Sequence, residues 1–202
     1  MSITIDQIAH IETDFPEKFG VPRQSGLCSS VGKIVFEETY RVAEALRGIE
    51  GYSHLWLIFG FSEVHRAAGE WSPTVRPPRL GGNRRVGVFA TRSPFRPNGL
   101  GLSSVRLLGM EHDPQRGDVL LVGGADLVSG TPIYDIKPYL AFTDSHPDAV
   151  GGFSDDVRDY RLAVRVAPAA AAAFAAVAEK VRTAVTDILA LDPRPSYQDD
   201  PS

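Results

Sequence analysis

The sequence has very little cysteine and no long apolar run. Cys28 is the single cysteine among 202 residues, which excludes an internal disulfide framework and a cysteine-rich zinc site. No stretch of 18 apolar residues occurs, so we expect no membrane-spanning helix. The N-terminal residues form neither a basic segment nor a long apolar one, so we expect no secretory signal. The sequence therefore predicts a cytoplasmic protein in which Cys28 is a small buried residue.

The common cofactor and nucleophile motifs are also missing. No GxGxxG string opens a helix and no GxxxxGK[ST] string occurs, which argues against a Rossmann dinucleotide site and a P-loop. The five histidines are scattered without metal-ligand spacing, and no GxSxG nucleophile elbow is present. We therefore expect no metal site and no covalent catalysis by a serine or cysteine.

Acidic residues are absent from one long window of the chain. Residues 71–110 contain seven arginines and no Asp, Glu or Lys, so this window carries +7 and the remainder of the chain −11. Such a separation of charge indicates an anionic ligand or partner, although the arginines could instead pair with the acidic remainder. Trp71, in the same window, could stack on a base or lie in the core. The arginines that could neutralise the phosphate groups of such a partner are Arg76, Arg79, Arg84, Arg85 and Arg96.

Short apolar segments separated by glycine and proline predict a mainly β fold, with a single β-barrel-like domain rather than a doubly wound sheet. The expected strands are residues 2–13, 30–36, 54–61, 85–91, 102–110, 118–128, 131–140 and 161–167. Helices are expected over residues 37–47 and 168–191. The Asp-rich segment 143–159 indicates a boundary. It separates a barrel domain over residues 1–145 from a small α/β extension over residues 146–202, with one strand, an Ala-rich helix and a polar tail.

Four stretches resemble the TsaA-like proteins. They read FPEKFGVPRQSGL, WSPTVRPPRLGGNRRVGVFATRSPFRPNGLGLS, DLVSGTPIYDIKPYL and DPRPSY, and the resemblance covers roughly residues 5–197. It implies an S-adenosylmethionine-dependent methyltransferase with a β-barrel outside the Rossmann class, working as a homodimer. It also implies that the enzyme methylates N6 of threonylcarbamoyladenosine at position 37 of tRNA.

The resemblance carries a set of cofactor contacts onto this sequence. They are Pro22, Arg23, Gln24, Ser62, Glu63, Arg92, Leu102, Ser129, Gly130, Thr131 and Pro132. Ser62 and Glu63 stand where related members have His-Gln, and Ser129 replaces a common Asp, which removes one carboxylate acceptor for the cofactor. Members of the family often continue after DPRP with a further strand-rich segment, whereas this chain ends at Ser202, so substrate choice could differ.

Methyl transfer from a sulfonium is an in-line displacement, so the site mainly has to align donor and acceptor and exclude water. The acylated N6 is a weak nucleophile that must lose a proton around the transfer step. Tyr134, Asp135 and Lys137 are the candidates for positioning or proton handling, and none is assigned as the base. Asp135 and Lys137 share one face of an expected strand, where they could instead form a simple ion pair.

Two alternatives remain open at this stage. The chain could be a methyltransferase of the same fold that acts on another substrate, or a non-catalytic module that binds S-adenosylmethionine or RNA. A turnover measurement separates the non-catalytic module from both methyltransferase interpretations.

Overall fold

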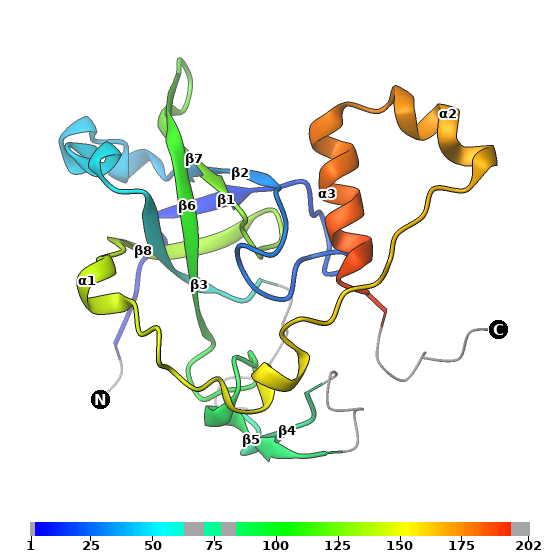
Figure 1. Ribbon diagram of the computed structural model, residues 1–202. Coiled ribbons are helices and arrows are strands. Elements are labelled where there is room, and N and C mark those ends of the chain that lie inside the picture. Colours follow the sequence, from blue (N-terminus) through cyan, green and yellow to red (C-terminus); the bar gives the residue numbers. More distant parts are fainter. Residues whose placement is uncertain (1–2, 63–70, 78–83, 195–202) are drawn as a thin grey trace.

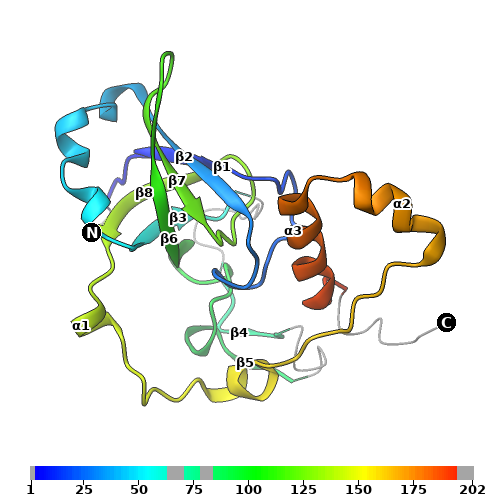
Figure 2. The same cartoon turned by 45° about the horizontal axis from the view of Figure 1, so that its top comes forward.

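The computed structural model describes residues 3–62, 71–77 and 84–194 of the chain. Its centre is a set of six strands: β1 (Ala9–Glu12), β2 (Val31–Phe36), β3 (His54–Gly60), β6 (Leu100–Asp113), β7 (Gly117–Gly123) and β8 (Thr131–Pro138). All neighbouring pairs are antiparallel, and the order β1-β2-β7-β6-β3-β8 closes because β8 also pairs with β1 (Figures 1 and 2). Closure leaves no free edge in this sheet.

The barrel forms because its strands alternate between apolar residues that fill the interior and residues that face outwards. In β3, Leu55, Leu57 and Phe59 are buried, while Trp56 and Ile58 on the opposite face are half-buried. The other buried members of the core are Ala9, Ile11, Ile34, Phe36, Leu46, Val105, Leu120, Val122, Ala125, Leu127 and Ile133.

Shorter elements surround the barrel. A two-stranded sheet of β4 (Thr74–Val75) and β5 (Val86–Gly87) lies below it in Figure 1 and is followed by a 3-10 helix (Val88–Ala90). After the barrel come α1 (Ala141–Asp144), a 3-10 helix (Gly152–Val157), α2 (Pro168–Ala176) and α3 (Glu179–Ala190). Within the described ranges, no helix is sufficiently long and apolar to cross a membrane.

Two irregular connections are tied together at one end of the barrel. The segment 13–30 joins β1 to β2, and the segment 124–130 joins β7 to β8. The amide of Gly26 donates to the carbonyl of Gly124 at 2.8 Å, and the Thr13 hydroxyl donates to the carbonyl of Leu127 at 3.0 Å. Gly124 has φ +73, and a Cβ there would lie 3.0 Å from the backbone of Gly26, so glycine is needed for this close approach.

α3 packs against the segment 13–30 beside the barrel (Figure 1). The amide and hydroxyl of Ser29 donate to Asp187 Oδ2 at 3.1 and 2.5 Å, and Cys28 Sγ lies 3.8 Å from the carbonyl oxygen of Ala184. Cys28 is buried, as expected from the sequence, and burial raises the pKa of its thiol. The C-terminal helix is therefore in direct contact with the segment that precedes β2.

The mainly β prediction is confirmed, but several expected elements differ from those observed. The helix expected over residues 37–47 is replaced by 3-10 helices at Glu38–Tyr40 and Ala43–Leu46, with a third at Ile49–Gly51, because Leu46 is the only buried side chain in these turns. The strand expected over residues 85–91 is reduced to β5 and a 3-10 helix. Residues 161–167 form no strand, since the closed barrel offers no edge to pair with.

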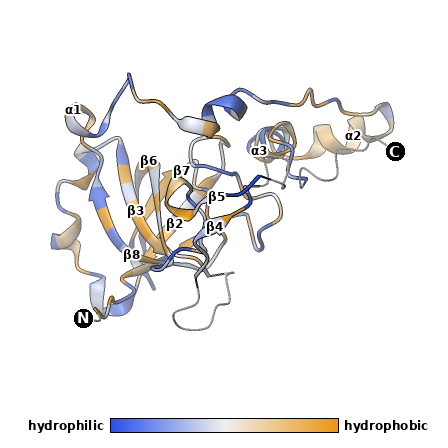
Figure 3. Ribbon diagram, turned by 90° about the horizontal axis from the view of Figure 1, so that it is seen from below, coloured by the Kyte–Doolittle hydropathy of each residue, from blue (hydrophilic) through white to orange (hydrophobic). Residues whose placement is uncertain are grey.

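The helix expected over residues 168–191 divides into α2 and α3 at Val177, which is extended with φ −74 and ψ 143. Figure 3 shows that α2 is apolar by composition, yet none of its residues is buried. The small extension is thus helical rather than α/β. The boundary at residue 145 stays a prediction.

Candidate functional site

Two cavities adjoin at the barrel end where β3 stops and β6 begins. One has a volume of about 320 Å³ and the other of about 430 Å³. Phe59, Phe61 and Asp126 line both, so these three residues form the shared wall. We call the first the aromatic cavity and the second the arginine cavity. Both have the size of a small-molecule binding site.

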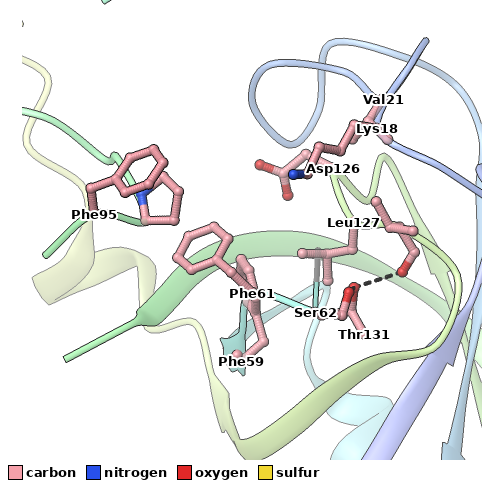
Figure 4. Close-up of a pocket in the computed structure, with 12 residues that line it drawn as sticks. Lys18, Val21, Phe59, Phe61, Ser62, Phe95, Asp126, Leu127 and Thr131 are labelled. Carbon is pink, nitrogen blue, oxygen red and sulfur yellow. Dashed lines mark hydrogen bonds between the residues drawn. The ribbon is translucent and has the colours of Figure 1, made fainter. Parts of the chain in front are cut away.

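The aromatic cavity is lined mainly by apolar side chains from four segments. The rings of Phe59 and Phe61 meet edge to face with centroids 5.3 Å apart, and Phe95 faces them across the space (Figure 4). At its floor the Ser62 hydroxyl lies 3.4 Å from the Thr131 hydroxyl. The remaining lining residues are Lys18, Val21, Gly60, Pro94, Asp126, Leu127 and Val128. Such a surface suits a flat apolar ring with a few polar atoms.

The arginine cavity brings Arg23, Arg92 and Arg96 together. Arg92 donates to the side-chain oxygen of Gln24, and Arg96 donates to the carbonyl of Thr91 at 3.1 Å. Asp126 is the one acidic residue among the described residues that line this cavity. The other lining residues are Phe59, Phe61, Leu100, Gly101, Leu102 and Ser103. An excess of guanidinium groups favours a carboxylate or phosphate ligand.

Asp126 lies between the two cavities, flanked by the buried residues Ala125 and Leu127. Its carboxyl group faces the space between Phe95 and Phe61, and the Lys18 side chain extends towards it (Figure 4). Burial raises the pKa of Asp126, and this effect exceeds the opposing effects of the Ser103 hydrogen bond and the Arg92 charge. Sequence reasoning did not select this residue. The available signal was a lone acid between apolar residues at the end of a strand.

The predicted cofactor residues divide between the two cavities and their surroundings. Arg23, Gln24, Arg92 and Leu102 line the arginine cavity, whereas Ser62 and Thr131 line the aromatic cavity. These six residues, from five separate places in the sequence, are brought within one site.

Four of the remaining predicted cofactor residues line neither cavity. Pro22 lines a neighbouring groove that also includes Arg194. Ser129 Oγ accepts a hydrogen bond from the amide of Thr13 at 3.3 Å, Gly130 has φ +85, and Pro132 pairs with His10 in the sheet. Glu63 lies outside the described residues. The cofactor assignment of these residues stays a prediction.

The three predicted catalytic residues lie on β8, away from the cavity linings. Lys137 Nζ and Asp135 Oδ2 are 2.8 Å apart, so the two residues do share one face and form an ion pair. A bulge leaves Tyr134 without a partner on β3, since Ile58 pairs with Asp135 and Phe59 with Ile133. Asp135 and Lys137 consequently share the outer face of the barrel with Ile58 and Trp56. Tyr134 packs against Gly60, which lines the aromatic cavity. A catalytic role for these three residues stays a prediction.

The arginine window surrounds a third hollow of about 710 Å³ beside the arginine cavity, lined by Arg76, Arg92 and Phe95 among others. Arg85 donates to the Thr74 hydroxyl at 2.6 Å and so links β5 to β4, and Arg84 is exposed. Arg76, Arg84 and Arg85 form no ion pair with a described residue, which argues against the alternative that they pair with the acidic remainder. Arg79 lies outside the described residues.

Trp71 is not a core residue. Its side chain is 44% exposed and stacks on Phe89, which is 73% exposed, with ring centroids 6.3 Å apart. The reason is that β4 and β5 form a separate small sheet, so this aromatic pair has no barrel interior to enter. The window therefore presents aromatic rings and arginines together on the surface.

Comparison with known proteins identifies the family. Residues 10–145 match the tRNA-methyltransferase O N-terminal domain. The chain is 43% identical to the tRNA (adenine(37)-N6)-methyltransferase of Escherichia coli K12, over 98% of this chain and 84% of that protein. A human protein of the same name is 34% identical over 76% of this chain and 34% of its own length. A crystal structure of TrmO from P. aeruginosa superimposes with a TM-score of 0.75 at 34% identity, covering 96% of this chain and 83% of that one. The chain belongs to the tRNA-methyltransferase O family.

Proposed function

We propose that this protein transfers the methyl group of S-adenosylmethionine to N6 of adenosine 37 in tRNA, and that the adenosine first carries a threonylcarbamoyl group. The observation that carries the proposal is the convergence of six predicted cofactor residues on two adjoining cavities. It occurs in a chain 43% identical to an enzyme named tRNA (adenine(37)-N6)-methyltransferase. Other relatives are named S-adenosylmethionine-dependent methyltransferases.

The residues present suit S-adenosylmethionine, which combines an adenine ring, a carboxylate and two positive charges. Arg23 and Arg92 would hold the carboxylate, because a guanidinium pairs with it through two parallel hydrogen bonds. Phe59 and Phe61 would pack against apolar parts of the ligand and keep water out. Asp126 places a single carboxyl group at the shared wall, where the two cavities meet. When bound, the cofactor supplies an electrophilic methyl group.

The arginine window supports tRNA as the partner. Arg76 lines the hollow beside the arginine cavity, Arg85 bonds to Thr74 of the same hollow, and Arg84 next to it is exposed. The three have no acidic partner among the described residues, so they are available to RNA phosphates. The exposed pair of Trp71 and Phe89 offers a stacking surface for an unpaired base near the anticodon. The acidic remainder of the chain would repel RNA and restrict where it binds.

The test is transfer of labelled methyl from S-adenosylmethionine to purified tRNA, with and without the threonylcarbamoyl group at position 37, followed by nucleoside mass spectrometry. Methylated threonylcarbamoyladenosine that forms only on the modified tRNA is the expected result. Product on the unmodified tRNA alone would limit the proposal to adenosine 37. Absence of product on both, from protein shown to bind the cofactor, would favour another acceptor or a binding module.

We also propose that the protein acts as a homodimer in the cytoplasm, as the resemblance to the TsaA-like proteins implies. Two large apolar side chains in the segment after β8, Phe142 and Val150, are 88% and 89% exposed, which is consistent with a surface that a second copy covers. Light scattering on the purified protein tests the dimer. A monomeric mass at micromolar concentration would contradict it.

A further inference from the structure

One buried oxygen stands apart from the rest of the interior. Among the side chains that the structure describes, Asp126 Oδ1 is the buried polar atom without a hydrogen-bond partner. Buried polar atoms nearly always form a hydrogen bond, because burial removes their hydrogen bonds to water and an unpaired atom has no replacement for them. An unpaired oxygen at the wall of a cavity indicates a group that forms its hydrogen bond with a bound ligand.

The surroundings fix this carboxyl group in place. Ala125 and Leu127 on either side are buried in the core, and the buried Ser103 of β6 lines the arginine cavity beside Asp126, where its hydroxyl lowers the pKa of the carboxyl group. The Lys18 side chain, from the segment before β2, extends towards it (Figure 4), and the charge of Arg92 acts on it. Arg23 and Arg96 line the same arginine cavity. The carboxyl group thus has a fixed position, a cationic environment and one free oxygen.

The position between two cavities is the decisive feature. The predicted cofactor contacts fall on both sides of the wall that Asp126 forms with Phe59 and Phe61. The sulfonium of S-adenosylmethionine lies between its adenosine end and its amino-acid end. A ligand that occupies both cavities therefore has its reactive middle near the shared wall, and the acceptor nitrogen must reach the same place.

We infer that Asp126 is a catalytic residue that accepts the proton leaving N6 of the target adenosine; this inference rests on the proposed function. The bond between the methyl carbon and sulfur breaks and its electron pair stays on sulfur. The N6 lone pair forms the new bond to carbon. The N6–H bond breaks, its electron pair stays on nitrogen, and the proton goes to Asp126 Oδ1. The sulfonium becomes a neutral thioether and the carboxylate a neutral acid, so charge balances.

The electrostatics suit this role. Burial raises the pKa of Asp126 above that of an exposed carboxyl group, which makes the carboxylate a stronger base. The positive charge of Arg92 acts in the opposite direction and favours the ionised form that accepts a proton. A different role for the same group would be to hold the cationic parts of the cofactor, and the experiment separates the two roles.

The experiment compares wild-type protein with Asp126→Asn, which keeps the shape and removes the basic oxygen. The control is Asp118→Asn, because Asp118 lies on β7 near the β6–β7 turn and pairs with His112 there. Calorimetry measures the Kd values for S-adenosylmethionine and S-adenosylhomocysteine, a gel-shift titration measures the Kd for modified tRNA, and single-turnover methyl transfer is followed from pH 5 to pH 9.

We expect Asp126→Asn to retain all three Kd values within about threefold and to lose about 10²-fold or more in transfer rate, a typical contribution of a general base. Its residual rate should lack the acid limb, in which the wild-type rate rises with pH as the carboxyl group ionises. A rate within tenfold of wild type would overturn the inference. So would weakened binding of S-adenosylmethionine but not of S-adenosylhomocysteine, which indicates a group that holds positive charge.

Ser103→Ala keeps the inference testable if Asp126→Asn does not fold. The Ser103 hydroxyl lowers the pKa of Asp126, so its removal should move the acid limb of the rate profile to higher pH while both ligands still bind. An unmoved limb would overturn the inference. If wild-type protein makes no product on either tRNA, the proposed function fails and the inference with it. An active wild type with an equally active Asp126→Asn overturns the inference alone.

Discussion

Replacing Gly101 by alanine is a direct test of how the shared wall is built. Gly101 lies on β6 opposite Phe59 of β3, and a Cβ at Gly101 would overlap the Phe59 ring. That ring is 4% exposed and packs edge to face on Phe61, so it has little room to turn. The added methyl group must therefore push Phe59 out of place, towards the cavities that it lines.

The size of the effect follows from this overlap. Inserting a methyl group into a packed interior typically costs about 1–3 kcal/mol of unfolding free energy. For a chain of this length that corresponds to a fall in Tm of about 2 to 12 °C. Because the displaced ring lines both cavities, we also expect the Kd for S-adenosylmethionine to rise about tenfold, which is about 1.4 kcal/mol of binding free energy.

Gly87→Ala is the matched control. Gly87 has φ −59 and ψ 139, which alanine adopts readily, and a Cβ there would meet no atom within 4 Å. Its unfolding free energy should change by no more than about 0.5 kcal/mol. Differential scanning calorimetry and titration calorimetry give both quantities. If Gly101→Ala matched the control in Tm and in cofactor Kd, the close contact between Gly101 and Phe59 could not be a constraint on the site.

Three further predictions concern the arginine window, the C-terminus and acid stability. Arg84→Glu should weaken tRNA binding about tenfold or more at low salt and leave cofactor Kd unchanged; equal loss of both would contradict the RNA assignment. Arg194→Ala removes the 2.8 Å partner of the buried Asp192, so Tm should fall by a few degrees, as circular dichroism would show. The Gln115 amide and Arg116 lower the pKa of Asp113, so its contribution to stability is present above pH about 4 and is lost as pH falls through the folded pKa. Asp113→Asn should therefore flatten the acid-unfolding curve, and an unchanged curve would refute the contribution.

The parts of the fold that depend on local pattern could be predicted from the sequence. The apolar run of β3 and the short apolar segment of β2 identified strands within a residue or two of their observed bounds. The spacing of Asp135 and Lys137 also indicated their shared face. These features depend on the two-residue repeat of a strand, which the sequence displays directly.

The parts that depend on distant partners could not be predicted in this way. Residues 161–167 have a strand-like composition but pair with no strand, and the closed barrel has no edge for them. The bulge at Tyr134 changes which β8 residues face the interior, and a one-residue shift of this kind leaves no local signal. The burial of Asp126 depends on the tertiary arrangement, because β6, β7 and the segment before β2 meet around it. The resemblance named six of the residues that line the two cavities, and the three-dimensional arrangement added Asp126.

The contact between the C-terminal residues and the segment before β2 can couple ligand binding in the arginine cavity to the docking of α3. Arg23 of the arginine cavity donates to the carbonyl of Asp192 at 3.2 Å, across 169 residues of sequence. If the docking of α3 helps to order Arg23, then linkage requires the reverse as well: a ligand that holds Arg23 must stabilise the docked helix by the same coupling free energy. Amide hydrogen exchange in α3 should therefore slow when S-adenosylmethionine binds, which makes the far end of the chain a reporter of an occupied site.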